Sequence, residues 1–284
     1  MFRSEFQRFI YETNADGSNK AGSYVAALDM LGPILANHYP QAVVNGSLWH
    51  SFTQEEITAL HKWLCAEARA AKNGKMDVVN DFKSKSYLLN NFCSAAVKAY
   101  REFLAVEGEA TEIIAAAATE RSGKNVAKAL KERITKSEGV LSGTFDTNKQ
   151  GRERLRLTIT RLDQSVFRKM TLENYDGRCC LTGLSIPEVL RASHISAWSE
   201  DEKNRLNPEN GLCLSATYDA AFDRHLISFD EDYRMILSKR LKEFYTDEVS
   251  NEWFHKREGQ KIEMPVRFLP SPQLLQKHRE KLLV

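Results

Sequence analysis

Four polar residues in the last third of the chain, His194, Asn210, Asp219 and Asp223, have types and a spacing that suit hydrolytic chemistry. An imidazole titrates near neutral pH, so His194 can take a proton from an attacking water. The two aspartates lie four residues apart, and both project from one face if a helix starts near Ser215. Like charges at that spacing repel each other, and a bound divalent cation would relieve the repulsion.

Each of these residues also has an ordinary structural interpretation. A lone histidine is more often a structural or surface residue than a base, and an Asn-Gly dipeptide such as the one at Asn210 favours a tight turn. Asp219 and Asp223 fit a solvated acidic helix face, and Asp223 also fits a cap for the turn that follows. Two carboxylates near the end of a helix are, however, disfavoured by its dipole, which favours a metal. A pair of hard oxygen ligands indicates Mg²⁺ or Mn²⁺ rather than Zn²⁺.

The order of residues around this set resembles the HNH, or ββα-metal, nuclease finger, in the variety often attached to bacterial restriction and anti-phage defence enzymes. The pattern runs through four segments, Tyr175–Gly183, Leu190–Ile195, Asn210–Leu214 and Tyr218–Asp223. The resemblance spans roughly residues 161–238. It implies that His194 activates the water, that Asn210 braces the loop, and that Asp219 and Asp223 bind the metal.

Two positions depart from the family pattern. Many relatives have an acidic residue or a second histidine as a further metal ligand where this chain has Ser193, which leaves the ligand set incomplete. His225 stands where relatives usually have glycine, and we interpret it as a harmless substitution rather than as a ligand.

Some relatives hold the finger together with two Cys-x-x-Cys pairs on zinc. Cys179, Cys180 and Cys213 lack that spacing, so the sequence argues against a structural zinc.

Three basic residues are candidate contacts to DNA phosphate. Arg168 and Lys169 end the predicted helix that leads into the finger, and Arg224 directly follows the acid pair. All three fit exposed helix residues equally well. The segment from Arg121 to Arg156 contains ten Lys or Arg against four Asp or Glu, although the net charge of the chain is only +2. This basic segment suits phosphate contact, and it equally suits a solvated helix face with a linker.

The predicted fold class is α+β, with an N-terminal all-α helical domain followed by a C-terminal HNH nuclease domain. We place the helical domain at residues 1–138, a linker and basic approach at 139–160, and the nuclease domain with its final helix at 161–284. In the helical domain, Thr53 and Glu56 have the spacing of a capping box, and Pro33 predicts a kink or an end of its helix. The helical domain would contribute target choice, partner docking or inhibition.

The composition of the chain indicates its solubility, its number of domains and its cellular compartment. Its 284 residues, 42% hydrophobic and 27% charged, are typical of a soluble protein with two domains. Five cysteines without regular spacing, no signal-peptide pattern at the start and no long apolar run predict a cytoplasmic protein that does not enter a membrane.

The sequence therefore predicts a metal-dependent DNA endonuclease that nicks one strand per active site. Restriction or anti-phage defence is the predicted context, with further subunits of a defence system as partners besides DNA. The alternative is a non-cleaving DNA-binding or adaptor protein on the same scaffold, which Ser193 and the unusual pair of aspartates favour. RNA ranks below DNA as a substrate, because no stretch of interleaved aromatic and basic residues suggests a stacking platform for single strands.

Overall fold

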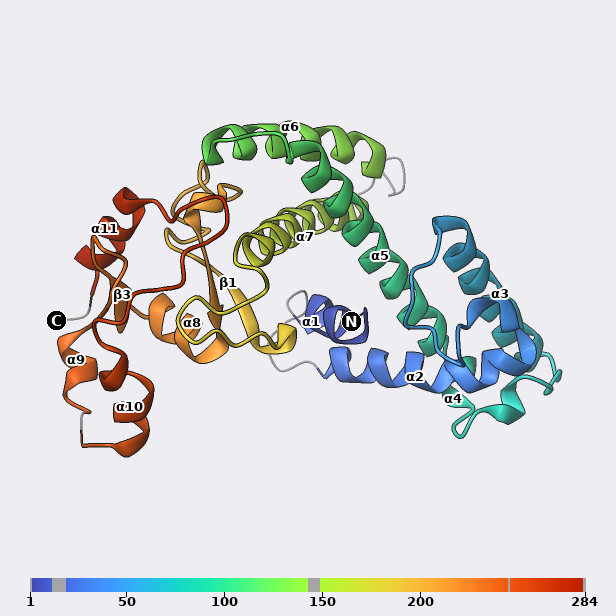
Figure 1. Cartoon of the computed structure of the whole chain (residues 1–284). Coiled ribbons are helices and arrows are strands. Elements are labelled where there is room, and N and C mark those ends of the chain that lie inside the picture. Colours follow the sequence, from blue (N-terminus) through green and yellow to red (C-terminus); the bar gives the residue numbers. More distant parts are fainter. Residues whose placement is uncertain (1, 12–18, 143–148, 245, 283–284) are drawn as a thin grey trace. The chain divides into compact units, whose positions relative to one another are not determined.

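The computed structural model describes residues 2–11, 19–142, 149–244 and 246–282 and divides the chain into two compact units, residues 1–109 and 110–284 (Figure 1). The first unit is built from helices, and both antiparallel strand pairs lie in the second unit. The predicted α+β fold class, with the helical part first, is therefore confirmed. In the part of the chain that the structure describes, no helix is long and apolar enough to cross a membrane.

The first unit contains α1 (Phe2–Tyr11), α2 (Lys20–His38), η1 (Pro40–Ala42), α3 (Gln54–Lys72), η2 (Val79–Asp81), α4 (Ser86–Leu89) and most of α5 (Phe92–Ala117). The second unit continues with α6 (Gly123–Ser142), α7 (Lys149–Asn174), η3 (Pro187–Val189), β1 (Leu190–His194), η4 (Pro208–Asn210), β2 (Gly211–Ser215), α8 (Ala216–Asp223), β3 (Ile227–Phe229), β4 (Met235–Leu237), α9 (Lys239–Lys242), α10 (Glu248–Trp253), η5 (His255–Arg257) and α11 (Pro272–Glu280).

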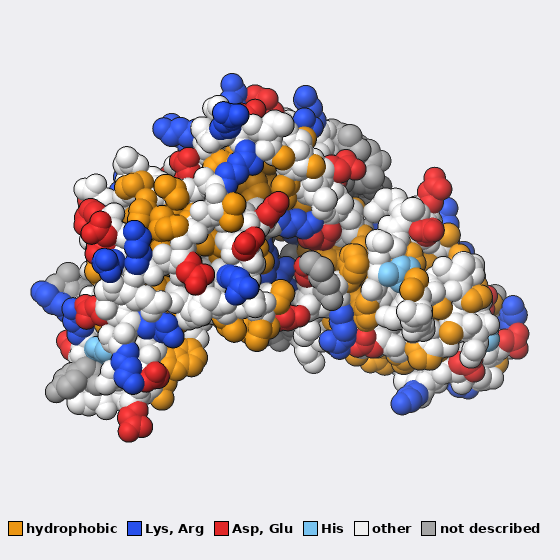
Figure 2. Space-filling view, viewed as in Figure 1, with side chains coloured by type: hydrophobic (Ala, Val, Ile, Leu, Met, Phe, Trp, Pro, Cys, Tyr) orange, Lys and Arg blue, Asp and Glu red, His pale blue; other side chains and the backbone are white. Residues whose placement is uncertain are grey.

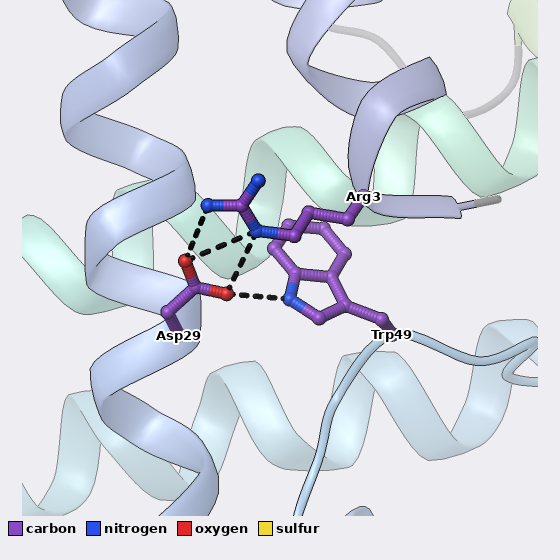
Figure 3. Close-up of polar contacts among 3 residues, drawn as sticks. All are labelled: Arg3, Asp29 and Trp49. Carbon is purple, nitrogen blue, oxygen red and sulfur yellow. Dashed lines mark hydrogen bonds and ion pairs between the residues drawn. The ribbon is translucent and has the colours of Figure 1, made fainter.

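Aromatic packing and a set of hydrogen bonds to one carboxylate hold α1 within the first unit. Phe6 packs edge-on against Tyr100 of α5, with ring centroids 5.3 Å apart. One turn earlier on α1, the guanidinium of Arg3 donates to both carboxylate oxygens of Asp29 on α2, as Figure 3 shows. The indole nitrogen of Trp49 donates to the same carboxylate at 2.7 Å. One acid thus joins α1, α2 and the segment before α3.

The local helix signals of the first unit are only partly correct. The capping box is confirmed, because the Thr53 hydroxyl accepts from the Glu56 amide and the Glu56 carboxylate accepts from the Thr53 amide. The predicted kink or end at Pro33 is wrong as an end, since α2 continues to His38. Leu31, Ile34 and Leu35, on both sides of the proline, are buried, so tertiary packing stabilises the helix past the proline.

The division of the chain differs from the predicted boundaries. It falls inside α5, between residues 109 and 110, rather than at 138/139. Residues 149–160 belong to α7 instead of forming a linker, while residues 143–148 lie outside the described residues. The reason is packing that local composition does not reveal. The buried side of α6 carries Val126, Leu130 and Ile134, and α6 packs against α7.

Two antiparallel hairpins form the centre of the second unit. In the β1–β2 pair, His194 lies opposite Gly211, and β3 pairs antiparallel with β4. The hairpins, α8 and α11 share one apolar core that includes the buried free thiols of Cys179, Cys180 and Cys213. Burial raises the pKa of Cys213 to about 12, so this thiol stays protonated and serves as packing.

Candidate active site

The two faces of the β1–β2 strand pair carry different functional side chains. The hydroxyl of Ser193 donates a hydrogen bond to the Asp219 carboxylate on α8. The ring of the next residue, His194, stacks on Phe167 of α7, with centroids 3.6 Å apart and planes 13° apart. Successive side chains of a strand point to opposite faces, so α8 covers one face of the hairpin and α7 the other. Asp219 and the imidazole therefore lie on opposite sides of β1.

The acid pair lies on α8, which begins at Ala216, next to the predicted start. The pKa of Asp219 is raised because the carboxyl is partly desolvated, and the Ser193 hydroxyl offsets this shift in part. Asp223 is a more exposed residue, yet desolvation and then the charge of Asp219 raise its pKa to about 6. Among the described residues, no ion pair involves either carboxylate. The charges of Arg191, Arg168 and Arg224 only partly oppose the rise in the pKa of Asp219, so a bound cation would stabilise the pair further.

The donors present fit a hydrated hard cation. The Ser193 hydroxyl is bonded to Asp219, and Asp223, one helical turn on, is near enough for the charge of Asp219 to raise its pKa. Over the described ranges, no group of three or more His, Cys, Asp or Glu side chains is placed to hold a metal. Mg²⁺ and Mn²⁺ accept few protein ligands and retain water, whereas structural zinc requires a closed shell of sulfur and nitrogen ligands. The residues therefore suit a cation that keeps most of its water.

The imidazole of His194 is neutral and held on three sides. Its Nε2 lies 3.0 Å from the carbonyl oxygen of Arg205, which can only accept, so Nε2 carries the proton. Phe167 covers one ring face, and the Trp198 ring meets the imidazole edge-on at 5.4 Å. Burial lowers the pKa of His194 to about 4, and the bond to the carbonyl opposes this only partly. Nδ1 has no hydrogen-bond partner among the described residues and keeps its lone pair.

The structure does not bring His194 into contact with Asp219 or Asp223. The sequence predicted that these three side chains meet around one ion. Instead the described contacts of the imidazole are with α7 and with the loop after β1, while Asp219 contacts Ser193. The alternation of side chains along β1 is the physical reason. The catalytic role of His194 and the metal-binding role of the acid pair remain predictions.

Asn210 has the contacts that a bracing residue needs. Its side chain is fully buried, and its Oδ1 accepts from the Ser196 amide at 2.8 Å. Its Nδ2 donates to the carbonyl oxygens of Ser196 and Asn204, at 3.2 and 3.0 Å. The Asn210 carbonyl also accepts from the Ile195 amide at 2.9 Å. One side chain thus ties both ends of the loop that directly follows His194, which supports the predicted role.

The three basic candidates occupy different environments. Arg168 donates to two backbone carbonyls at the entrance to β1, at 2.9 and 3.2 Å, so its guanidinium helps to hold the strand in place. The Lys169 ammonium donates to the Thr111 hydroxyl at 2.9 Å. Arg224 is exposed at the end of α8, beside the acid pair. Of the three, Arg224 has the placement that suits a phosphate contact best, and all three remain predictions.

Sequence reasoning did not identify Phe167 and Arg205 as neighbours of His194. No local sequence pattern indicates that Phe167, on another helix, or the carbonyl of Arg205, eleven residues downstream, contacts the ring of His194.

The structure explains why His225 departs from the family pattern. Its φ is 52°, in the left-handed region that glycine adopts without strain, so the position after α8 favours the glycine seen in relatives.

A comparison with protein families supports the class that this fold and site define. Residues 179–230 match the family model described as HNH endonuclease. The matched segment contains β1, β2, α8 and β3 with all four predicted site residues. This segment is similar to the HNH endonuclease family, and the match supports a nuclease domain in general. A search among curated proteins found no match. The first unit lies outside the matched segment.

Proposed function

We propose that the protein is a DNA endonuclease that uses Mg²⁺ or Mn²⁺ held by Asp219 and Asp223. The observation that carries this proposal is the acid pair itself. Two carboxylates with raised pKa values project from α8, without an ion pair among the described residues, inside the segment that matches the nuclease family. A cation bound there supplies positive charge for the scissile phosphate and lowers the pKa of a bound water.

His194 is the base in this proposal. It is the last residue of β1, so its ring lies at the end of the hairpin, where the strand turns into the loop that Asn210 braces. Because Nε2 is engaged by the Arg205 carbonyl, Nδ1 is the nitrogen that can accept a proton. The pKa of about 4 makes the ring a weak base. The phosphate of a bound DNA would raise that pKa and strengthen the base.

One acid pair and one imidazole per chain predict a nick in one strand rather than a double-strand break. The proposed setting is bacterial restriction or anti-phage defence, with other subunits of such a system as partners. This setting is supported by the resemblance of the residue pattern alone.

A second candidate function is that of a non-cleaving DNA-binding or adaptor protein. Two observations favour it. The ring of His194 contacts α7 rather than the acids, and no third acid, histidine or cysteine joins the pair among the described residues. Both features would suit an HNH scaffold that binds DNA without cutting it.

The deciding experiment incubates supercoiled plasmid with the wild-type protein and Mg²⁺ or Mn²⁺, beside three variants. These are His194→Ala, the double variant Asp219→Asn/Asp223→Asn, and Asp232→Asn, which removes an exposed acid elsewhere in the same unit. We expect the wild type and Asp232→Asn to produce open circles at equal rates and the other two to lose at least about 100-fold. Full activity of His194→Ala would assign the base to another group. An inactive wild type that also shows no calorimetric metal binding would support the adaptor.

A further inference from the structure

Helix α6 separates its basic side chains from its buried ones. The exposed set, which we call the α6 lysine stripe, follows one helix face at intervals of four and three residues and consists of Lys124, Lys128 and Lys131. The buried set packs on the other side of the helix and consists of Val126, Leu130 and Ile134. The stripe therefore faces solvent. Figure 2 shows Lys and Arg side chains along the edge of the second unit where Figure 1 places α6.

Among the described residues, none of the three ammonium groups of the stripe forms a hydrogen bond or an ion pair. The charge of Lys131 does act on Asp163 of α7. Burial raises the pKa of Asp163 to about 6, and the charges of Arg205 and Lys131 oppose this rise. Of the acids of the helix, Glu132 directly follows the stripe, four residues after Lys128, and Glu138 lies nearer the C-terminal end. Like charges at these intervals repel one another, so bound anions would relieve the stripe.

The start of α6 is fixed beside the predicted active-site loop. The backbone amide of Gly123 donates to the Glu209 carboxylate at 3.0 Å, and Glu209 directly precedes Asn210. The Glu209 carbonyl in turn accepts from the Ser271 amide at 2.8 Å. A Cβ at position 123 would lie 2.3 Å from the Asn207 amide oxygen, so the helix and the loop are in close contact. The Glu209 carboxylate already accepts from the N-terminal amide of α6, so the lysine side chains are the part of this helix that suits phosphate binding.

We propose that the α6 lysine stripe binds backbone phosphates of the DNA duplex that flank the cut phosphate. The inference rests on the proposed nuclease function and adds a contact surface outside the segment that matches the family, residues 179–230. From Lys124 to Lys131 the helix rises about 10 Å. One DNA strand carries a phosphate about every 3.4 Å of duplex axis, so three lysines span about three phosphates. The close contact of Gly123 with Glu209 places the first lysine near the loop and the others farther out.

The test measures duplex binding by the His194→Ala protein, which holds DNA without cutting it, between 50 and 200 mM salt. Changing Lys124, Lys128 and Lys131 to Gln should lower the slope of log affinity against log salt by about 2.7, since each phosphate contact contributes about 0.9. The matched control changes three exposed lysines of the first unit, Lys72, Lys75 and Lys83, to Gln and removes the same charge. We expect the control to keep the original slope. All six positions are exposed, so both variants should fold normally, which their melting temperatures check.

The outcomes separate this inference from the proposed function. If the parent protein binds duplex and the wild type nicks plasmid, an unchanged slope in the stripe variant overturns the inference alone. An equal loss in the control would mean that only net charge matters, which also overturns it. If the wild type neither binds nor nicks DNA, the proposed function fails first. A stripe variant that loses affinity for single-stranded RNA but not for duplex DNA would show that the partner is misassigned.

Discussion

Ser193 and His194 are adjacent, yet they serve different faces of the same strand. The Ser193 hydroxyl donates to Asp219, and a hydroxyl keeps lone pairs with which it can also face a cation. A serine here can therefore orient one acid and contribute a neutral oxygen, where many relatives place a charged ligand. His194 depends on different groups, because Phe167 and the Arg205 carbonyl set its ring plane and its tautomer.

Replacing Asn210 by Asp tests the bracing role with the smallest change of shape. The carboxylate can still accept from the Ser196 amide, but it cannot donate to the carbonyls of Ser196 and Asn204. Two buried carbonyl groups would lose their partner and an unpaired charge would be buried, so we expect a loss of about 2–4 kcal/mol in the free energy of unfolding. Nicking should fall with it even at temperatures where the variant is fully folded. Urea unfolding and the plasmid assay measure the two effects, and normal activity of the folded variant would contradict the bracing role.

The acid pair predicts a pH-dependent stability. The pKa of Asp223 is raised to about 6 in the folded protein, above its ordinary value near 4, so the folded state binds more protons between these pH values. Stability from this group is present below about pH 4 and is lost as the pH rises through about 6. Without metal, Asp223→Asn should therefore melt about 1–2 °C above the wild type at pH 7.5 and level with it at pH 4.

Added Mg²⁺ should reverse this order at pH 7.5. The cation stabilises the wild type by binding the folded state, whereas the variant lacks one of its ligands. Thermal melts of both proteins in EDTA and in about 10 mM Mg²⁺, a concentration that saturates a weak site, measure their order without and with the cation. If neither Mg²⁺ nor Mn²⁺ changes the melting temperature of the wild type, the pair is a solvated acidic face rather than a metal site.

Among the elements, those with local signals could be predicted from the sequence. The capping box at Thr53, the start of α8 and the β3–β4 hairpin follow from short patterns of turn, cap and alternating residues. Contacts between distant elements could not be predicted. The stacking of His194 on α7 and the close approach of α6 to the η4 turn depend on tertiary packing, which no local pattern encodes. The site's residue types were therefore predictable, but the direction of its imidazole was not.

Gly123 provides an element-scale test of the junction between α6 and the loop. In Gly123→Ala the added Cβ would lie within 3 Å of both Asn207 and Glu209, so the helix start and the loop must separate. We expect a lower melting temperature and reduced nicking, because Asn210 follows Glu209 directly. Gly108→Ala is the matched control. Its Cβ meets nothing within 4 Å in α5, and alanine favours a helix by about 0.5–1 kcal/mol over glycine, so this variant should be slightly more stable and fully active. A Gly123→Ala protein as stable as wild type would disprove the tight junction.

On the scale of the whole molecule, the two units differ in their similarity to a known family. The nuclease-family match lies entirely in the second unit, whose core also receives the final helix α11. There His278 is buried, its ring stacks on Phe222 at 3.8 Å, and its two nitrogens bond the Phe222 carbonyl and the Ser228 hydroxyl. The carbonyl only accepts, so Nε2 carries the proton and Nδ1 accepts from the serine. This arrangement suits the neutral imidazole that burial favours.

The second unit should consequently lose stability in mild acid. Burial and then the nearby His225 lower the pKa of His278 to about 4 in the folded protein, against about 6.5 in the unfolded chain. Between these values the unfolded chain binds more protons, so stability falls as the pH drops from 6.5 towards 4, by up to about 3 kcal/mol. His278→Gln can keep the bond to the Phe222 carbonyl but loses the stacked ring. It should melt below the wild type at pH 7.5, and the gap should narrow at pH 4.5, because glutamine does not titrate. Calorimetric scans of both proteins from pH 7.5 to 4.5 measure this gap. A gap that stays constant would show that His278 keeps its charge state on folding and that α11 is held in place by packing alone.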